Sequence, residues 1–212
     1  MSEPLRGRNP SGESEQATRA KAPENSLSPL EEQVLSHLAT KGSKNIDEAV
    51  KEMSLRYEPV YAAFHSLEKR EMIMAVGTTS YRGRDYDSFW LTERGLVEAL
   101  LSGADPGLVL AVVKKTFRKF DDMAMFAQVA CRLPERALRT ILSLYPSESL
   151  QIGIGEILNF VFMHLDLGVG ELKTLYEIVR ESPHHKEMAD EAIKKGSSRF
   201  EELKKAVGLS HD

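Results

Sequence analysis

The chain has 212 residues, a net charge of −4 and 42% hydrophobic residues. These values are ordinary for one large or two small folded domains, and they exclude a protein that binds nucleic acid through overall positive charge alone. The longest apolar run, residues 152–167, is interrupted by glycines, Glu156, Asn159 and His164. No segment therefore has the uninterrupted length of a membrane span, and nothing resembles a secretory signal. We expect a cytoplasmic protein that makes no membrane contact.

The first 26 residues contain almost no large apolar side chains. Such a segment cannot bury enough surface to offset its ordering entropy, so residues 1–26 are predicted to be a disordered tail. Its acidic and basic residues are equal in number, so it is no basic arm.

Three helices are predicted next. Ser28 begins the first with a capping box to Glu31, and Gly42 ends it. A second helix is expected near Ile46–Met53 and a third near Glu58–Arg70, with a short turn between them. The spacing of apolar residues in the third helix predicts the following outward side chains: Glu58, Tyr61, Ala62, His65 and Lys69.

A β-hairpin follows the third helix. Met72–Ser80 is rich in β-branched residues, Tyr81–Tyr86 has the glycine and polar residues of a hairpin tip, and Asp87–Leu91 is the expected return strand. Thr92–Gly95 then caps a fourth helix, Leu96–Leu101, which ends at Gly103.

The remainder of the chain is predicted to be helical throughout, with no strand after Leu91 and no fixed-period repeat. The expected helices are Pro106–Phe120, Asp122–Arg132, Pro134–Leu144, Glu148–His164, Gly170–Arg180, Pro183–Lys195 and Ser198–Val207. Residues 152–167 are apolar around most of a helix, which is typical either of a domain core or of a subunit interface. Cys131 lies in an apolar helical run and is interpreted as a buried structural thiol.

Three segments, Leu27–Leu38, Val60–Arg70 and Trp90–Leu96, resemble the winged-helix transcriptional regulators of archaea and bacteria. The resemblance covers roughly a third of the chain. It implies that Val60–Arg70 belongs to a recognition helix, and that Leu91-Thr-Glu-Arg-Gly95 is the leucine-threonine-x-x-glycine end of the wing. The expected fold class is mainly α: a winged helix-turn-helix of three helices and a β-hairpin wing in residues 27–103, followed by an all-helical domain in residues 104–212.

DNA binding by such a domain requires its cations to be concentrated on one face, because residues 28–103 contain nine basic and twelve acidic residues. The third helix and the hairpin tip supply the candidates. The predicted DNA-binding residues are Arg56, Tyr57, Tyr61, His65, Lys69, Arg82 and Arg84. Glu58 opposes this prediction, unless it reads a cytosine amine or stabilises the helix N-terminus.

The predicted function is therefore a sequence-specific transcriptional regulator that binds double-stranded DNA as a homodimer. The alternative is a non-enzymatic module whose winged helix docks on a protein or ribonucleoprotein. No nucleophile with a base partner and no acid–base pair is evident, so no enzyme and no cofactor are expected. Three roles remain possible for the helical domain, namely dimerisation, binding of a partner protein, or binding of an effector.

Three other features have competing interpretations. Lys114, Lys115, Arg118 and Lys119 form either a second phosphate-binding strip or, as we favour, a charged outer face opposite Val113, Phe117 and Phe120. His184-His185 with Glu187 and Asp190, and His164 with Asp166, lack the spacing of a metal site and are predicted to be surface clusters. The two Gly-x-Gly pairs, Gly153/Gly155 and Gly168/Gly170, are interpreted as packing or turn glycines.

Overall fold

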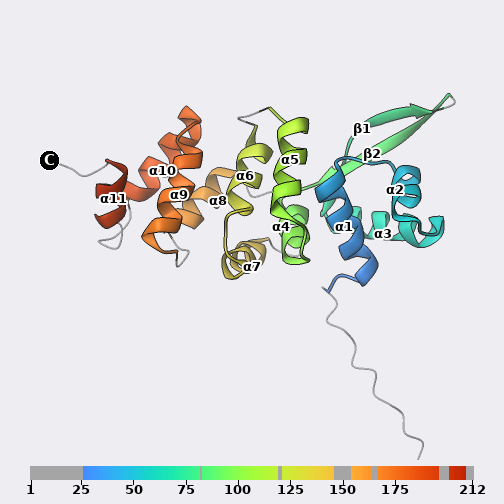
Figure 1. The fold of residues 1–212 in the computed structure, drawn as a ribbon, viewed down its shortest axis with the longest axis horizontal. Helices are drawn as coiled ribbons and strands as arrows, with labels where there is room; N and C mark the ends of the chain where they lie inside the picture. Colours follow the sequence, from blue (N-terminus) through green and yellow to red (C-terminus); the bar gives the residue numbers. More distant parts are fainter. Residues whose placement is uncertain are drawn as a thin grey trace, which may run out of the picture.

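The computed structural model describes residues 26–81, 83–118, 121–145, 154–163, 167–195 and 201–208. Within them the chain is mainly helical, and an antiparallel hairpin follows the first three helices, a layout compatible with a winged helix. Figure 1 shows an elongated molecule with α1–α3 and the hairpin at one end and α11 at the other. The elements are α1 Pro29–Lys41, α2 Ile46–Met53, α3 Tyr57–Lys69, β1 Ile73–Tyr81, β2 Arg84–Leu91, α4 Glu93–Leu101, α5 Pro106–Thr116, α6 Asp122–Ala130, α7 Glu135–Leu144, α8 Ile154–Met163, α9 Val169–Val179, α10 Pro183–Lys195 and α11 Glu201–Val207.

The first two helices begin at side-chain caps. The Ser28 hydroxyl accepts the amide of Glu31, and the Glu31 carboxylate accepts the amide of Ser28 at 2.7 Å, which confirms the predicted capping box. Asn45 and Glu48 form a second box at the start of α2. Ser54 adopts φ 55°, a left-handed conformation that ends α2 and turns the chain into α3.

The hairpin extends further than the sequence predicted. β1 continues to Tyr81 and β2 already begins at Arg84, so most of the expected tip Tyr81–Tyr86 belongs to the strands, and Gly83 lies in a turn with φ 73°. At the base, Phe89 exchanges backbone hydrogen bonds with Lys44 at 2.9 and 3.1 Å. This bridge adds the segment before α2 to the free edge of β2.

The hairpin is joined to α4 by a compact junction around Thr92. Its amide donates to the carbonyl of Met72 at 3.1 Å, and its hydroxyl donates to the carbonyl of Glu71 at 2.7 Å while accepting the amide of Gly95. Because Thr92 caps the helix, α4 begins at Glu93 rather than at the predicted Leu96. A Cβ on Gly95 would stand 1.8 Å from the Met72 carbonyl oxygen, so this close approach needs glycine.

The helices after α4 were all predicted, but several are shorter than expected. α5 ends at Thr116, because Phe117 is extended and packs on Trp90 with ring centroids 5.7 Å apart. α6 ends at Ala130 and α7 begins at Glu135, while α9 keeps the predicted length but spans Val169–Val179, one residue earlier than expected. The parts of the predicted helices Glu148–His164 and Ser198–Val207 that lie beyond α8 and α11 fall outside the described residues, as do residues 1–25 of the predicted tail. No strand follows Leu91 in the part that the structure describes.

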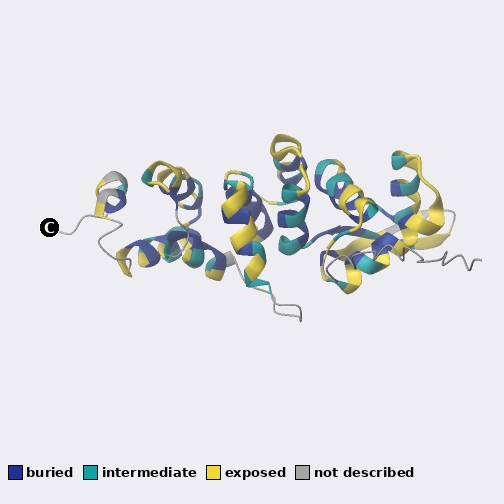
Figure 2. Cartoon of the chain, turned by 90° about the horizontal axis from the view of Figure 1, so that it is seen from below, coloured by how far each residue is buried: buried dark blue, intermediate teal, exposed yellow. Residues whose placement is uncertain are grey.

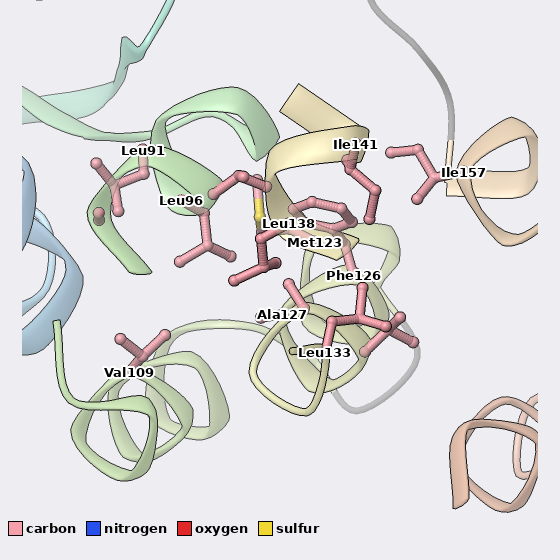
Figure 3. Packing of buried hydrophobic residues seen from close by; sticks show 14 of the residues in the cluster. Leu91, Leu96, Val109, Met123, Phe126, Ala127, Leu133, Leu138, Ile141 and Ile157 are labelled. Carbon is pink, nitrogen blue, oxygen red and sulfur yellow. The ribbon is translucent and has the colours of Figure 1, made fainter. Parts of the chain in front are cut away.

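Buried side chains form one continuous cluster along the molecule. Figure 2 shows dark blue residues on the facing sides of neighbouring helices, and Figure 3 shows Leu96 of α4, Phe126 of α6 and Leu138 of α7 meeting within it. Four residues of α8 are fully buried, namely Ile157, Leu158, Val161 and Phe162, which agrees with the core interpretation of that helix. Its role as a subunit interface stays a prediction.

Candidate nucleic-acid interface

The outward face of α3 carries a ladder of aromatic rings, the Tyr57–Tyr61–His65 ladder. Tyr57 stacks on Tyr61 with centroids 5.8 Å apart, and the ring of His65 meets the edge of Tyr61 at 4.3 Å. Tyr57 is 48% and Tyr61 44% exposed. The predicted outward and inward faces of α3 are both confirmed, since Val60, Ala63, Phe64 and Leu67 are buried.

Contacts on the inner side of α3 hold this face rigid. The buried Glu31 of α1 accepts the hydroxyl of Ser66 at 2.6 Å and lies 3.5 Å from Arg70. Although burial opposes ionisation, these partners and Ser28 keep the pKa of Glu31 below its usual value. Phe64 meets the ring of Phe89 edge-on at 5.5 Å. α3 is therefore fixed to both α1 and β2.

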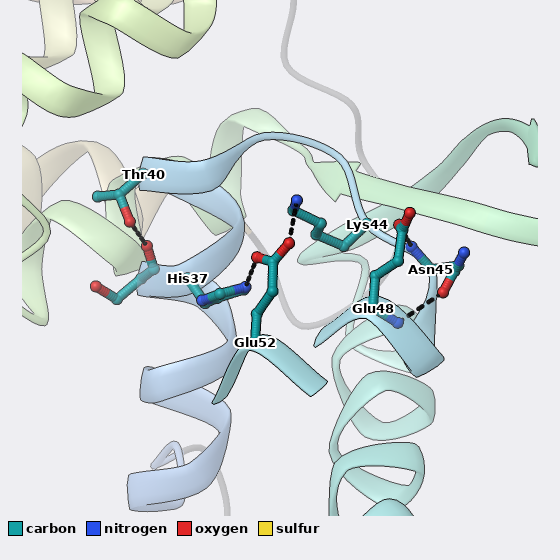
Figure 4. Close-up of polar contacts among 7 residues, drawn as sticks. His37, Thr40, Lys44, Asn45, Glu48 and Glu52 are labelled. Carbon is teal, nitrogen blue, oxygen red and sulfur yellow. Dashed lines mark hydrogen bonds and ion pairs between the residues drawn. The ribbon is translucent and has the colours of Figure 1, made fainter. Parts of the chain in front are cut away.

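A polar cluster ties α2 to α1 (Figure 4). Glu52 of α2 accepts Lys44 Nζ at 2.6 Å and lies 3.0 Å from His37 Nε2 of α1. The hydrogen bond from Lys44 lowers the pKa of Glu52, and burial lowers the pKa of His37. These contacts set the position of α2, from which the turn leads into α3.

Cations lie at three places around the ladder. Arg56 is the N-cap residue of α3 and is exposed, and the helix has no side-chain cap at that end. Lys69 lies in the last turn of α3, and Arg84 is the first residue of β2. In the described part of the chain none of the three makes an ion pair. Arg82 lies outside the described residues.

Tyr86 of the wing lies near enough to influence Tyr57, and it was not among the candidates predicted from the sequence. Partial burial raises the pKa of Tyr57, and smaller contributions come from Asp47 of α2, from Tyr61 and from Tyr86. Tyr57 therefore lies where α2, α3 and the wing converge. Side chains alternate along a strand, so Tyr86 and Arg84 lie on one face of β2, and this spacing could have identified Tyr86 from the sequence. Glu58 is exposed beside Tyr57 and brings negative charge to the same end of α3.

The basic run of α5 does not form the predicted single helical face. Lys114 and Lys115 are exposed in the last turn of α5, but Arg118 follows the extended Phe117 and is outside the helix. Val113 is buried and Phe117 half-buried, in agreement with an inner apolar side. Lys119 and Phe120 lie outside the described residues.

His185 corrects the prediction of a histidine surface cluster. His184 is exposed, but His185 is 2% exposed and lies between α10 and α6. Its Nδ1 is 2.8 Å from the Ser182 hydroxyl, and its Nε2 is 3.2 Å from the Asp122 carboxylate. These three residue types also form hydrolytic triads, but here Ser182 is itself buried at 5%. The arrangement therefore joins two helices and offers no access to a substrate.

The remaining predicted features are distributed over the helical part. Cys131 is half-buried rather than buried, and burial raises the pKa of its thiol to about 11. A Cβ on Gly155 would meet the Met188 side chain, which confirms a packing glycine, and Gly168 caps α9. Among the described residues, no cluster of three or more His, Cys, Asp and Glu side chains is arranged to hold a metal ion. No described helix has the length and apolarity of a membrane span.

Comparison with known proteins gives no relative for this chain. No protein-family model matches it, and neither the curated proteins nor the solved structures contain a match.

Proposed function

We propose that this protein is a winged-helix transcriptional regulator that binds double-stranded DNA in a sequence-specific way. The observation that carries the proposal is the outward face of α3. It is held rigidly from behind by Glu31 and by the packing of Phe64 on Phe89 of the wing, and its residues Tyr57 and Tyr61 are nearly half exposed. A helix presented in this way beside a hairpin is the arrangement that inserts into a DNA major groove.

Phosphate contacts would come from the periphery of this face. Arg56 stands at the uncapped N-terminus of α3, where free backbone N–H groups and the helix dipole also favour an anion. Arg84 lies at the far end of the hairpin, where it reaches the backbone beside the groove. Lys69 supplies a third cation in the last turn of α3. Such contacts set orientation and affinity, while the Tyr57–Tyr61–His65 ladder faces the base edges.

A salt titration of binding to random-sequence duplex DNA tests the proposal. Counterion release makes the logarithm of the affinity fall with the logarithm of salt by about 0.9 per phosphate neutralised. The Arg56→Ala/Arg84→Ala double variant is expected to lower this slope by about two phosphates. The matched control is Lys173→Ala/Lys194→Ala, which removes the same charge from exposed positions on α9 and α10 and leaves the slope unchanged. Equal slopes for the two double variants would refute the proposed contacts.

A second candidate function has an observation of its own. Leu55 is 38% exposed, next to the exposed Tyr57 and Tyr61. Tyrosine-rich apolar surfaces are typical of protein interfaces, and the acidic balance of residues 28–103 suits a basic partner. Absence of duplex binding even at low salt would favour this function, in which the same face of α3 docks on a protein or ribonucleoprotein.

The proposal includes a homodimer, because regulators of this kind place two recognition helices on a two-fold DNA site. Sedimentation of the free protein tests this part directly, since a monomer at micromolar concentration would contradict it. The helical part would then supply the dimer contact or bind a partner or an effector.

A further inference from the structure

The residue types on the outward face of α3 restrict what that face can read in DNA. Its exposed residues are Tyr57, Glu58, Pro59, Tyr61, Ala62, His65, Glu68 and Lys69. Arginine pairs with guanine and asparagine or glutamine with adenine through two parallel hydrogen bonds. None of these three residue types occurs among these exposed residues, and Arg56, the N-cap residue before them, is assigned to phosphate in the proposed function.

The first two turns are the part that enters the groove most deeply, and there the face is largely apolar. The rings of Tyr57 and Tyr61, the ring of Pro59 and the methyl group of Ala62 are all exposed. The one apolar feature on a base edge in the major groove is the C5-methyl group of thymine. Tyr57 and Tyr61 are stacked on each other, so their rings are held in place before any contact with DNA.

We infer that the Tyr57–Tyr61 pair selects target sequences by contact with thymine methyl groups in the major groove. The inference rests on the proposed function and specifies its target as rich in A·T pairs. Glu58 at the same end of the helix is compatible with this choice, because its carboxylate can accept the N6 amine of adenine, the partner of thymine, as well as the N4 amine of cytosine. Lysine can also pair with guanine, but Lys69, the lysine on this face, lies in the last turn, roughly 18 Å along the helix axis from Tyr57.

The test compares two short duplexes of one mixed A·T sequence, one with thymine and the other with deoxyuridine throughout. Deoxyuridine lacks only the C5-methyl group. The thymine duplex is expected to bind more tightly by about fourfold for each methyl contacted, the factor that corresponds to burial of one methyl-sized group. A G·C duplex with 5-methylcytosine, which carries a methyl at the same position, is expected to bind more tightly than its unmethylated counterpart.

Variants locate the effect on the rings. Tyr61→Ala is expected to reduce the thymine-to-uracil affinity ratio towards one, and Tyr61→Phe, which keeps the ring and lacks the hydroxyl, is expected to restore it. Tyr61 is 44% exposed, so folding does not depend on it. Leu108→Ala is the matched control, because Leu108 is a 51% exposed apolar residue on α5 and leaves the ratio unchanged.

The outcomes separate this inference from the proposal on which it rests. Salt-dependent duplex binding with equal affinity for thymine and uracil would overturn the methyl contact and leave DNA binding standing. A ratio above one that Tyr61→Ala leaves unchanged would assign methyl recognition to another element and also overturn the inference. Failure to bind any duplex at low salt would remove both.

Discussion

Replacement of Gly95 by alanine tests the junction between the hairpin and α4. The added Cβ would stand 1.8 Å from the Met72 carbonyl oxygen, and the obstacle is backbone, which cannot rotate away. Relief requires α4 to move by more than about 1 Å, an overpacking that typically costs about 1–3 kcal/mol. The same movement strains the hydrogen bonds of Thr92 to Met72 and Glu71, each worth about 1 kcal/mol. Alanine is favoured over glycine in a helix by about 1 kcal/mol, so the net loss is about 2–4 kcal/mol.

Urea unfolding monitored by circular dichroism measures this loss as a lower midpoint. Two glycines serve as controls. Gly170 is exposed in α9 and a Cβ there meets nothing within 4 Å, so Gly170→Ala is expected to be neutral or stabilising by up to about 1 kcal/mol. A Cβ on Gly155 meets the flexible end of Met188, so Gly155→Ala is expected to cost less than Gly95→Ala. An unchanged or higher midpoint for Gly95→Ala would refute the close approach of α4 to the hairpin.

Three further predictions concern Glu31, the contact between His185 and Asp122, and Cys131. Glu31→Gln should lower the free energy of unfolding by about 1–2 kcal/mol at neutral pH. Because the folded pKa of Glu31 is lowered, its contribution is present above the ordinary value of 4.5 and is lost as the pH falls below it, so the two unfolding curves should converge in acid. His185→Ala should lower the free energy of unfolding by about 2–3 kcal/mol, and Asp122→Ala by less than about 1 kcal/mol, since the Asp122 side chain is 70% exposed. Equal losses for the two variants in urea unfolding would contradict the assignment of His185 as the buried partner that matters for stability. The Cys131 thiol, with a pKa of about 11, should react slowly with a disulfide reagent at pH 8 and rapidly after unfolding.

The elements that could be predicted from the sequence are those fixed by near neighbours in the chain. Ser28 and Glu31 are three residues apart, and the box that they form begins α1 where expected. The apolar spacing of α3 correctly separates its buried face from its exposed face, and the candidates Tyr57, Tyr61 and His65 are together on the exposed one.

The errors arose where a partner distant in the sequence decides the conformation. Tyr81–Tyr86 is polar and contains a glycine, which is typical of a loop, but Ser80 pairs with Asp85 and Tyr81 with Arg84, so both strands extend almost to Gly83. His185 was predicted to be exposed because its neighbours are polar, while its contact Asp122 lies 63 positions earlier. Neither outcome is encoded in local pattern.

The acidic balance of residues 28–103 is a poor guide to the charge of the α3 face, because several of its carboxylates are held by the fold away from the outward side of that helix. Glu31 and Glu48 accept the backbone amides that begin α1 and α2, and Glu52 is neutralised by Lys44. Arg56 and Arg84, in contrast, make no ion pair within the described residues and stay available to phosphate. Next to α3 the charge is set by Arg56, Lys69 and Arg84 together with the exposed Glu58 and Glu68, while at longer range the full acidic charge of residues 28–103 still slows the approach of DNA. We therefore predict an affinity for DNA that is weak at physiological salt and rises steeply as the salt concentration is lowered. A basic domain of the same fold would show the same salt dependence, but its affinity would be higher at every salt concentration.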